Sequence, residues 1–313
     1  MHTGTALPPL INYDSKHELR AFLDERGLGM RKKYGQNFLI NPAIRMRLLD
    51  ALELKPGDHV WEIGPGLGAM TKGLLDRGGQ VTAFEIDPAF IGILKEIFAE
   101  KLTSGNSFNA EKAFTLIEGD VLKTWPQVKT EEDKDLFLMG NLPYNIAASL
   151  LAGFIEKQRF FKRIVVTVQR EVALRMAAKP GSADYSSFSV LCSSVYKVNT
   201  IQTISASSFY PAPRVDSQGV YLDLLPRRET LPKLFYPLVR GLFLGRRKTI
   251  RNTLSQFAAS GIIMQEGNIA GREMAAEILA RSGISGDRRP ETLELHEFAA
   301  LAAFMEDLFT HGS

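Results

Sequence analysis

The sequence predicts an α/β protein with a doubly wound, mostly parallel sheet, followed by a small all-helical C-terminal domain. Short apolar runs alternate with helical patterns from about residue 59 to residue 169. Such alternation is typical of a parallel sheet covered by helices on both faces. A glycine-rich loop follows the first of these runs, and the strand patterns stop after Pro226. These observations together favour an open, Rossmann-like sheet with helices added at its C-terminal end.

The expected elements follow in chain order after a loose tail at residues 1–13. Ser15 caps a short helix that ends at Gly27, and Asn41 followed by Pro42 starts a second helix that runs to about Leu54. We expect strands at 60–64, 80–87, 113–120, 136–140, 163–169, 196–206 and 218–225, and intervening helices at 70–77, 88–101 and 146–157. Four further helices are expected at 232–244, 248–260, 272–280 and 293–309. The chain then divides into an N-terminal extension (1–30), a sheet domain (31–225) and a helical domain (226–313).

Composition excludes several classes of protein. The chain has 313 residues, of which 45% are hydrophobic and 23% charged, and this is enough for a sizeable core. Its single cysteine, Cys192, excludes an internal disulfide framework and a cysteine-based metal cluster. No apolar run reaches the roughly 18 to 20 residues that a membrane span needs, and the N-terminus shows no signal or transit pattern. We expect a cytoplasmic protein without a metal.

The glycine loop suggests a nucleotide-type ligand at the carboxyl edge of the sheet. Its glycines are Gly64, Gly66 and Gly68, and Ala69 occupies the third position of a dinucleotide-binding pattern. Glu62 precedes the loop. A carboxylate there would repel a pyrophosphate, but it would accept the amino group of a methionine-like tail.

Three further strands end in polar side chains. Glu85 is placed to accept both hydroxyls of a ribose, with a solvated strand end as the alternative. Asp120 is placed to accept from an adenine amine, with a helix cap as the alternative. Asn141 ends the strand at 136–140. Together with Glu62 and Gly64, these strand ends indicate S-adenosylmethionine followed by a target amine.

The tetrapeptide Asn141-Leu142-Pro143-Tyr144 suits a planar base whose exocyclic amine must become nucleophilic. The Asn141 side-chain oxygen and the Leu142 carbonyl would each accept one amine hydrogen and localise the lone pair. Both are neutral acceptors, so no shifted pKa is needed. Pro143 fixes the turn and Tyr144 offers a face for stacking. The alternative is an ordinary turn between a strand and a helix.

Two basic runs suggest contacts with phosphates. One contains Arg31, Lys32 and Lys33, with Arg45 and Arg47 nearby. The other, within residues 226–251, contains eight basic residues against Glu229: Arg227, Arg228, Lys233, Arg240, Arg246, Arg247, Lys248 and Arg251. Either run alone is often only a solvated face. Two runs flanking one pocket favour binding of a nucleic-acid backbone.

From about Lys32 to about Leu308 the chain resembles the KsgA/RsmA-type ribosomal RNA adenine dimethyltransferases. The resemblance rests on KKYGQNFLINP, WEIGPGLGAMT, FEID, EGD, GNLPYNIAASLL, SSFYPAPRVDS and FLGRRKTIRNTL, all in family order. The last two segments, and Leu142 after Asn141, favour this family over the related erythromycin-resistance methyltransferases. The resemblance implies a class I methyltransferase that acts late in small-subunit assembly. It would dimethylate two adjacent adenines near the 3′ end of small-subunit rRNA, as a monomer.

The resemblance also implies site residues. Cofactor contacts would come from Asn37, Leu39, Gly64, Glu85, Asp120 and Asn141. The target base would be held by Asn141, Leu142, Pro143, Tyr144 and Phe209, and RNA would be contacted by Arg31, Lys32, Lys33, Arg246, Arg247, Lys248 and Arg251. Pro211 and Pro213 would keep the Phe209 loop extended. The alternative for Phe209 is an aromatic residue of the core.

Three other functions stay open on the residues alone. A DNA adenine methyltransferase would use the same asparagine-proline-aromatic chemistry, but no target-recognition domain is evident. An assembly or transcription factor would keep the fold without catalysis, although every chemical position is intact. A nicotinamide dehydrogenase would give the tetrapeptide no task.

Overall fold

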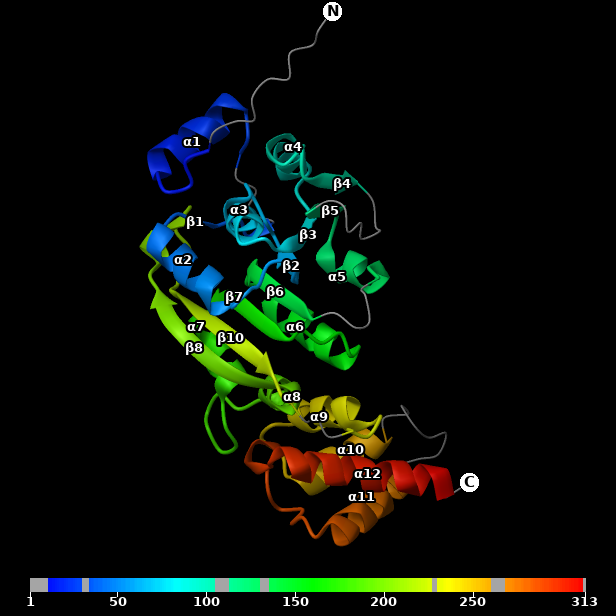
Figure 1. Cartoon of the computed structure of the whole chain (residues 1–313). Helices are drawn as coiled ribbons and strands as arrows, with labels where there is room; N and C mark the ends of the chain where they lie inside the picture. Colours follow the sequence, from blue (N-terminus) through cyan, green and yellow to red (C-terminus); the bar gives the residue numbers. More distant parts are fainter. Residues whose placement is uncertain are drawn as a thin grey trace, which may run out of the picture. The chain divides into compact units, whose positions relative to one another are not determined.

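A computed structural model of the chain describes residues 11–29, 34–104, 113–129, 135–226, 230–259 and 268–311 (Figure 1). Its contacts divide the chain into two compact units. The first contains residues 1–154, 159–173 and 198–224, and the second contains 155–158, 174–197 and 225–313. The second unit therefore takes in segments that lie before the boundary expected near residue 226.

The first unit is built on an eight-stranded sheet in the order β4-β5-β3-β2-β6-β7-β10-β8. The strands are β2 (His59–Ile63), β3 (Gln80–Glu85), β4 (Leu102–Ser104), β5 (Phe114–Glu118), β6 (Leu136–Asn141), β7 (Arg163–Gln169), β8 (Tyr196–Ile204) and β10 (Ser217–Leu224). The pairs from β4 through β7 are parallel, and β10 runs antiparallel to β7. The chain moves outward from β2 to β3 and β5 and then returns to β6 beside β2. The order reverses between β2 and β6, which is where open α/β sheets bind ligands.

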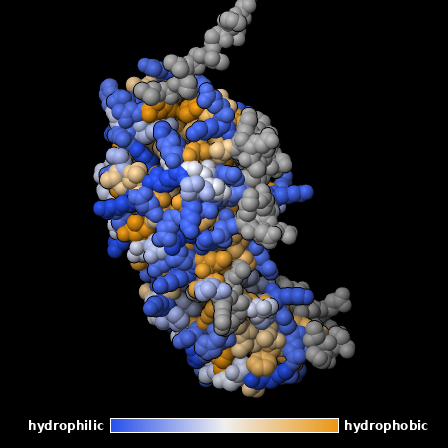
Figure 2. All heavy atoms as spheres, in the orientation of Figure 1, coloured by the Kyte–Doolittle hydropathy of each residue, from blue (hydrophilic) through white to orange (hydrophobic). Residues whose placement is uncertain are grey.

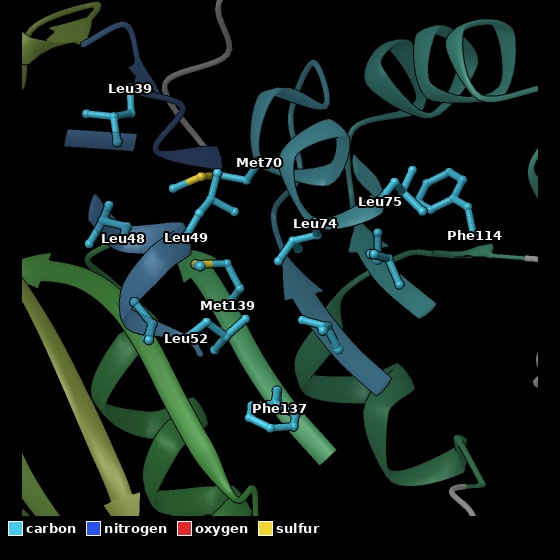
Figure 3. Packing of buried hydrophobic residues seen from close by; sticks show 14 of the residues in the cluster. Leu39, Leu48, Leu49, Leu52, Met70, Leu74, Leu75, Phe114, Phe137 and Met139 are labelled. Atoms are coloured by element: carbon cyan, nitrogen blue, oxygen red, sulfur yellow. The ribbon is translucent and has the colours of Figure 1, made fainter. Parts of the chain in front are cut away.

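Helices cover both faces of this sheet, as expected for a doubly wound fold. On one face α2 (Pro42–Ala51), α3 (Ala69–Asp76) and α4 (Pro88–Ile97) pack against the strands. Figure 3 shows that cluster, with Leu48 and Leu49 of α2, and Leu52 directly after it, near Met70 and Met139. Side chains alternate along each strand, so neighbouring positions face the other way. On the second face, aromatic rings pack against one another. They belong to Trp61, Phe84, Trp125, Phe154 of α6 (Ala147–Glu156) and Phe161.

The N-terminal segment packs on the first unit through α1 (Lys16–Glu25). Ser15 caps this helix by accepting from the Glu18 N–H at 3.2 Å, as predicted. Leu19 and Leu23 are buried with Leu67 of the glycine loop. The tail expected at residues 1–13 is wrong for its last positions, because Ile11 and Tyr13 pack against the same cluster.

Two short strands pair segments that lie far apart in the sequence, and two short helices follow strands of the sheet. Strand β1 (Phe38–Leu39) pairs antiparallel with β9 (Phe209–Tyr210), after the single-turn helix Ala206–Ser208. The helix Val121–Thr124 (α5) follows β5, and α7 (Arg170–Ala177) follows β7. Four of these elements, β1, β9, α5 and α7, were not expected from the sequence, and strand β4 was not expected either.

The second unit consists mainly of helices. They are α8 (Ser187–Val195), α9 (Phe235–Leu244), α10 (Ile250–Ala259), α11 (Asn268–Ser282) and α12 (Leu295–His311). The four C-terminal helices confirm the sequence prediction to within a few residues at their ends, whereas α8 was missed. Within the described ranges, no helix is long and apolar enough to cross a membrane.

The visible face is mostly hydrophilic, and its apolar side chains form small separate patches (Figure 2). The exposed large apolar side chains in the described part of the chain are Met46, Ile86, Leu122, Leu174, Val215 and Leu244. Ile86 and Leu122 line the cavity described next.

Candidate functional site

A cavity of about 250 Å³ lies at the carboxyl ends of the parallel strands, where the strand order reverses. Six residues predicted as cofactor contacts all line it: Asn37, Leu39, Gly64, Glu85, Asp120 and Asn141. Glu62 and Pro143 line it as well. The structure therefore brings the predicted strand-end residues to one place.

The glycine loop requires glycine for conformational and steric reasons. Gly64 and Gly66 have φ of +68° and +58°, a region that side-chain-bearing residues rarely adopt. A Cβ at Gly66 would also lie 2.9 Å from the Phe38 ring. The loop therefore packs directly under the segment that carries Asn37 and Leu39.

Glu62 is a buried carboxyl group, 2% exposed, in the wall of the cavity. Its pKa is raised to about 8: burial is the largest cause, the neighbouring charge of Glu85 acts in the same direction, and hydrogen bonds from Thr71 oppose the shift. One of these bonds joins the Thr71 hydroxyl to Glu62 Oε2 at 2.7 Å. An unpaired carboxylate in such a place is costly, so the site favours a cationic partner for Glu62.

Glu85 is held rigidly at the end of β3. Its Oε1 accepts the N–H groups of Ile86 and Asp87 at 2.8 Å, and its Oε2 accepts the Gly66 N–H at 3.1 Å. Burial is the largest cause of its raised pKa. Glu85 is only 5% exposed, so the alternative of a solvated strand end is wrong. The fixed carboxylate of Glu85 lines the cavity beside the glycine loop.

Asp120 combines the two roles considered for it. It is the N-cap of α5, because Oδ1 accepts the Leu122 N–H at 3.0 Å. It also lines the cavity. The helix cap therefore fixes the carboxylate at the cavity wall and does not remove it from the site.

Asn141 is fixed at both ends of its side-chain amide. Its Nδ2 donates to the Asn37 carbonyl at 2.6 Å, and its Oδ1 accepts from the Thr167 hydroxyl. Next in the turn, the Tyr144 hydroxyl is 2.8 Å from Ser217 Oγ, and burial raises the Tyr144 pKa. Thr167 and Ser217 gave no signal in the sequence, because their contacts depend on how β7 and β10 pair with their neighbours.

Phe209 has a different environment from the rest of the predicted site. Its side chain is 2% exposed and belongs to the buried cluster that includes Leu39 and Met139. Its backbone is extended, and the Tyr210–Pro211 peptide bond is cis. Neither Phe209 nor Tyr144 lines the cavity. In this structure Phe209 therefore packs as an aromatic residue of the core, which was the alternative considered from the sequence.

The N-terminal segment and helix α2 add residues to the cavity that the sequence did not indicate. Tyr13, Leu19 and Arg45 all line it. The Tyr13 hydroxyl donates to the Leu67 carbonyl in the glycine loop at 3.0 Å. Arg45 forms an ion pair with Asp14 and donates to the Leu39 carbonyl at 3.1 Å. No local pattern marks Tyr13, because its role depends on contact with a loop 54 positions later.

The structure describes only some of the basic residues that were predicted to contact RNA. Arg31, Lys32 and Lys33 lie outside the described residues, as do Arg227 and Arg228. In the second unit Arg246, Arg247, Lys248 and Arg251 are exposed. Lys248 and Arg251 line a groove together with Arg272. This unit therefore presents several cations to solvent, as phosphate binding requires.

The family model and two relatives that match this chain are all named as ribosomal RNA methyltransferases. A family model described as ribosomal RNA adenine dimethylase matches residues 27–278. A ribosomal RNA small subunit methyltransferase A of Treponema denticola is 43% identical over 304 residues, covering 96% of this chain and 98% of that protein. A protein of the same name from Bacillus cytotoxicus is 35% identical and covers 90% of this chain and 92% of its own length.

Solved structures share the fold. A dimethyladenosine transferase from Plasmodium falciparum has a TM-score of 0.66 at 23% identity, covering 85% of this chain and 96% of that chain. The 23S rRNA methyltransferase ErmE has a TM-score of 0.58 at 20% identity, covering 86% and 99%. These likenesses confirm the predicted class I methyltransferase fold with additional C-terminal helices.

Proposed function

Because the chain belongs to the ribosomal RNA adenine dimethylase family, we propose that it dimethylates the 6-amino groups of two adjacent adenines near the 3′ end of small-subunit rRNA. The enzyme acts in the cytoplasm as a monomer, late in small-subunit assembly. The observation that carries this proposal is the fixed amide of Asn141 at the cavity wall, directly before the backbone carbonyl of Leu142.

S-adenosylmethionine fits the donor set of the cavity. When bound, it supplies an electrophilic methyl group on a sulfonium centre. The buried carboxyl of Glu62 suits the cationic amino group of a methionine tail, and the fixed oxygens of Glu85 suit the two hydroxyls of a ribose. Asp120 would accept from the adenine amine, and Ile86 and Leu122 give apolar surface beside it. The segment with Asn37 and Leu39 closes the site over the glycine loop.

Asn141 and Leu142 make the target amine nucleophilic. The lone pair of the 6-amino group is delocalised into the adenine ring, so the group attacks poorly. The Asn141 Oδ1 and the Leu142 carbonyl each accept one amine hydrogen and localise that lone pair on nitrogen. Preorganised acceptors of this kind lower a barrier because they need no reorganisation during the reaction. Neither group titrates, so the two acceptors orient the amine without taking its proton. The amine nitrogen becomes cationic as it gains the methyl group, and its proton then leaves to solvent.

Tyr144 would hold the target base once it has left the RNA stack. Unstacking costs a few kcal/mol, and stacking on an aromatic ring returns roughly 1–3 kcal/mol per base. The hydroxyl contact of Tyr144 with Ser217 fixes the edge of its ring. We propose Phe209 as the opposite wall, since its strand β9 pairs with the β1 residues that precede the site. Stacking on Phe209 requires its ring to leave the cluster in which it packs.

The helical domain at 226–313 supplies phosphate contacts in this proposal. Arg246, Arg247, Lys248 and Arg251 are exposed cations in the second unit, and Arg31, Lys32 and Lys33 would add a second basic run. Phosphate contacts release counterions, so binding to subunits should weaken steeply with salt.

The test is transfer of labelled methyl groups from S-adenosylmethionine to under-methylated small ribosomal subunits. Mature subunits, naked duplex DNA and the Asn141→Ala variant serve as controls. We expect label in dimethyladenine of the rRNA, none in DNA, and none with the variant. Label in DNA would move the assignment to DNA adenine methyltransferases. Tight subunit binding without label would mean that the chain serves assembly alone.

A further inference from the structure

Thr167, in the interior of β7, contacts both residues that the proposed mechanism uses as acceptors. Its hydroxyl donates to Asn141 Oδ1, and its backbone carbonyl accepts the Leu142 N–H at 3.1 Å. The contacts follow from strand register, because Asn141 and Thr167 are paired positions of the parallel strands β6 and β7. Thr167 is 1% exposed, so water does not compete for its hydroxyl.

Thr167 is a buried polar residue in an otherwise apolar part of β7. The neighbouring positions Val165, Val166 and Val168 are buried and apolar. Valine has nearly the same shape as threonine and would pack there without a polar atom to satisfy. A buried hydroxyl without a partner costs free energy. Thr167 therefore fits this strand because Asn141 Oδ1 accepts a hydrogen bond from its hydroxyl.

The two hydrogen bonds of the Asn141 amide define one orientation. The Asn37 carbonyl is only an acceptor, so it must face Nδ2. A flipped amide would set Oδ1 against that carbonyl and would lose the bond. The Thr167 hydroxyl holds Oδ1 from the other side. A carbonyl-type oxygen has two lone pairs, so one remains for a substrate amine in the cavity.

We propose that Thr167 is the positioning residue for methyl transfer: its hydroxyl sets the direction of the Asn141 acceptor oxygen, while its carbonyl fixes the following peptide. The inference rests on the proposed function, because the amine of the target base is the group that Asn141 must meet. Thr167 acts through Asn141 and does not contact substrate.

The test compares Thr167→Val, Thr167→Ser and Thr115→Val by methyl transfer to under-methylated small subunits. Valine removes the hydroxyl at nearly constant shape, and serine keeps it. Thr115 is a matched control, since it is a buried threonine of β5 in the same sheet. Thr167→Val should lower kcat about tenfold, because an Asn141 oxygen that is no longer oriented loses roughly the worth of one hydrogen bond to the amine in the transition state. The KM values for cofactor and subunits should stay within about twofold, because ground-state binding is retained.

Rescue separates positioning from packing. Thr167→Ser should recover most of the wild-type kcat, and Thr115→Val should match the wild type. A Thr167→Val enzyme with unchanged kcat, a serine variant as slow as the valine variant, or an equal loss in Thr115→Val would overturn the proposal.

A spectroscopic readout keeps the inference distinct from the proposed function. The side-chain amide signals of Asn141, identified by their loss in Asn141→Ala, should shift in Thr167→Val and stay in place in Thr115→Val. If the wild type methylates no subunits, the proposed function fails, and these signals still decide whether Thr167 orients Asn141. Signals unmoved by Thr167→Val would refute the orienting role.

Discussion

Asn141 Nδ2 donates to the backbone carbonyl of Asn37 at 2.6 Å, across 104 positions of sequence. The bond joins the turn after β6 to the segment that closes the cavity. Gly35 also lies beside this turn, since a Cβ there would be 3.6 Å from the Pro143 Cβ. The predicted cofactor segment and the predicted acceptor turn are therefore one connected structure, and a change in one should be felt in the other.

Asn141→Asp should show this coupling. Aspartate has the same shape but replaces Nδ2 with an oxygen, which sets two acceptors against each other at the Asn37 carbonyl. We expect kcat for methyl transfer to fall roughly 100-fold or more, as when one preorganised group is lost from a catalytic site. Calorimetry should also show weaker binding of S-adenosylmethionine. Asn145→Asp adds the same charge in the same turn, and an equal loss in that variant would attribute the effect to charge alone.

Glu62 should make stability depend on pH. Burial raises its pKa from 4.5 to about 8, so the folded state holds the proton more tightly than the unfolded chain. The contribution is fully present below about pH 4.5 and is lost as pH rises through 8, by on the order of a few kcal/mol. Glu62→Gln lacks this titration. Its Tm should match the wild type at pH 5 and exceed it increasingly toward pH 9. Parallel Tm profiles for the two proteins would contradict the assignment.

Binding of S-adenosylmethionine should release a proton from Glu62. Near pH 6.5 the carboxyl is mostly protonated in the free protein, because its pKa is about 8. A cationic amino group beside it favours the charged form and lowers that pKa. Calorimetry at pH 6.5 in two buffers of different ionisation heat should detect up to about one proton released. Glu62→Gln is the control, and identical heats in both buffers with the wild type would exclude this pairing.

Strands β2, β3, β5 and β6 were predictable because they are mainly apolar runs followed by glycine or acid. Helix α8 was not, since Phe188, Val190, Leu191 and Val195 are all buried and no polar face marks a helical period. Strand β9 was missed for a different reason. Two residues such as Phe209 and Tyr210 carry no periodic pattern, and only pairing with β1 defines the strand.

The site was predictable where function sits on strand ends. Gly64, Glu85 and Asn141 follow apolar runs, and parallel strands bring such ends to one edge. Thr167 lies inside an apolar run, and its contact with Asn141 depends on register. Tyr13 lies outside every regular element and reaches the cavity only through tertiary packing. Residues such as Thr167 and Tyr13, which act through contacts with distant residues, therefore cannot be predicted from local sequence patterns.

Phe209 should contribute to stability if it packs in the core, and to catalysis if the target base also stacks on its ring. Phe209→Ala should lower the free energy of unfolding by about 3–5 kcal/mol, because the ring is 2% exposed in a packed cluster. Phe209→Leu should retain most of that stability. Denaturant unfolding and kcat/KM on subunits, measured on both variants, separate the roles. A leucine variant with wild-type kcat/KM would assign Phe209 to the core alone.

Tyr13→Phe should weaken cofactor binding without affecting the fold. The variant removes only the hydroxyl that donates to the Leu67 carbonyl at 3.0 Å, so the N-terminal segment loses its bond to the glycine loop. A hydrogen bond is worth about 0.5–1.5 kcal/mol net, and the Kd for S-adenosylmethionine should rise roughly two- to tenfold while kcat at saturation stays close to the wild type. Tyr221→Phe removes a hydroxyl outside the cavity lining and is the matched control. An unchanged Kd in Tyr13→Phe, or an equal rise in Tyr221→Phe, would show that the N-terminal segment covers the cavity without holding the cofactor.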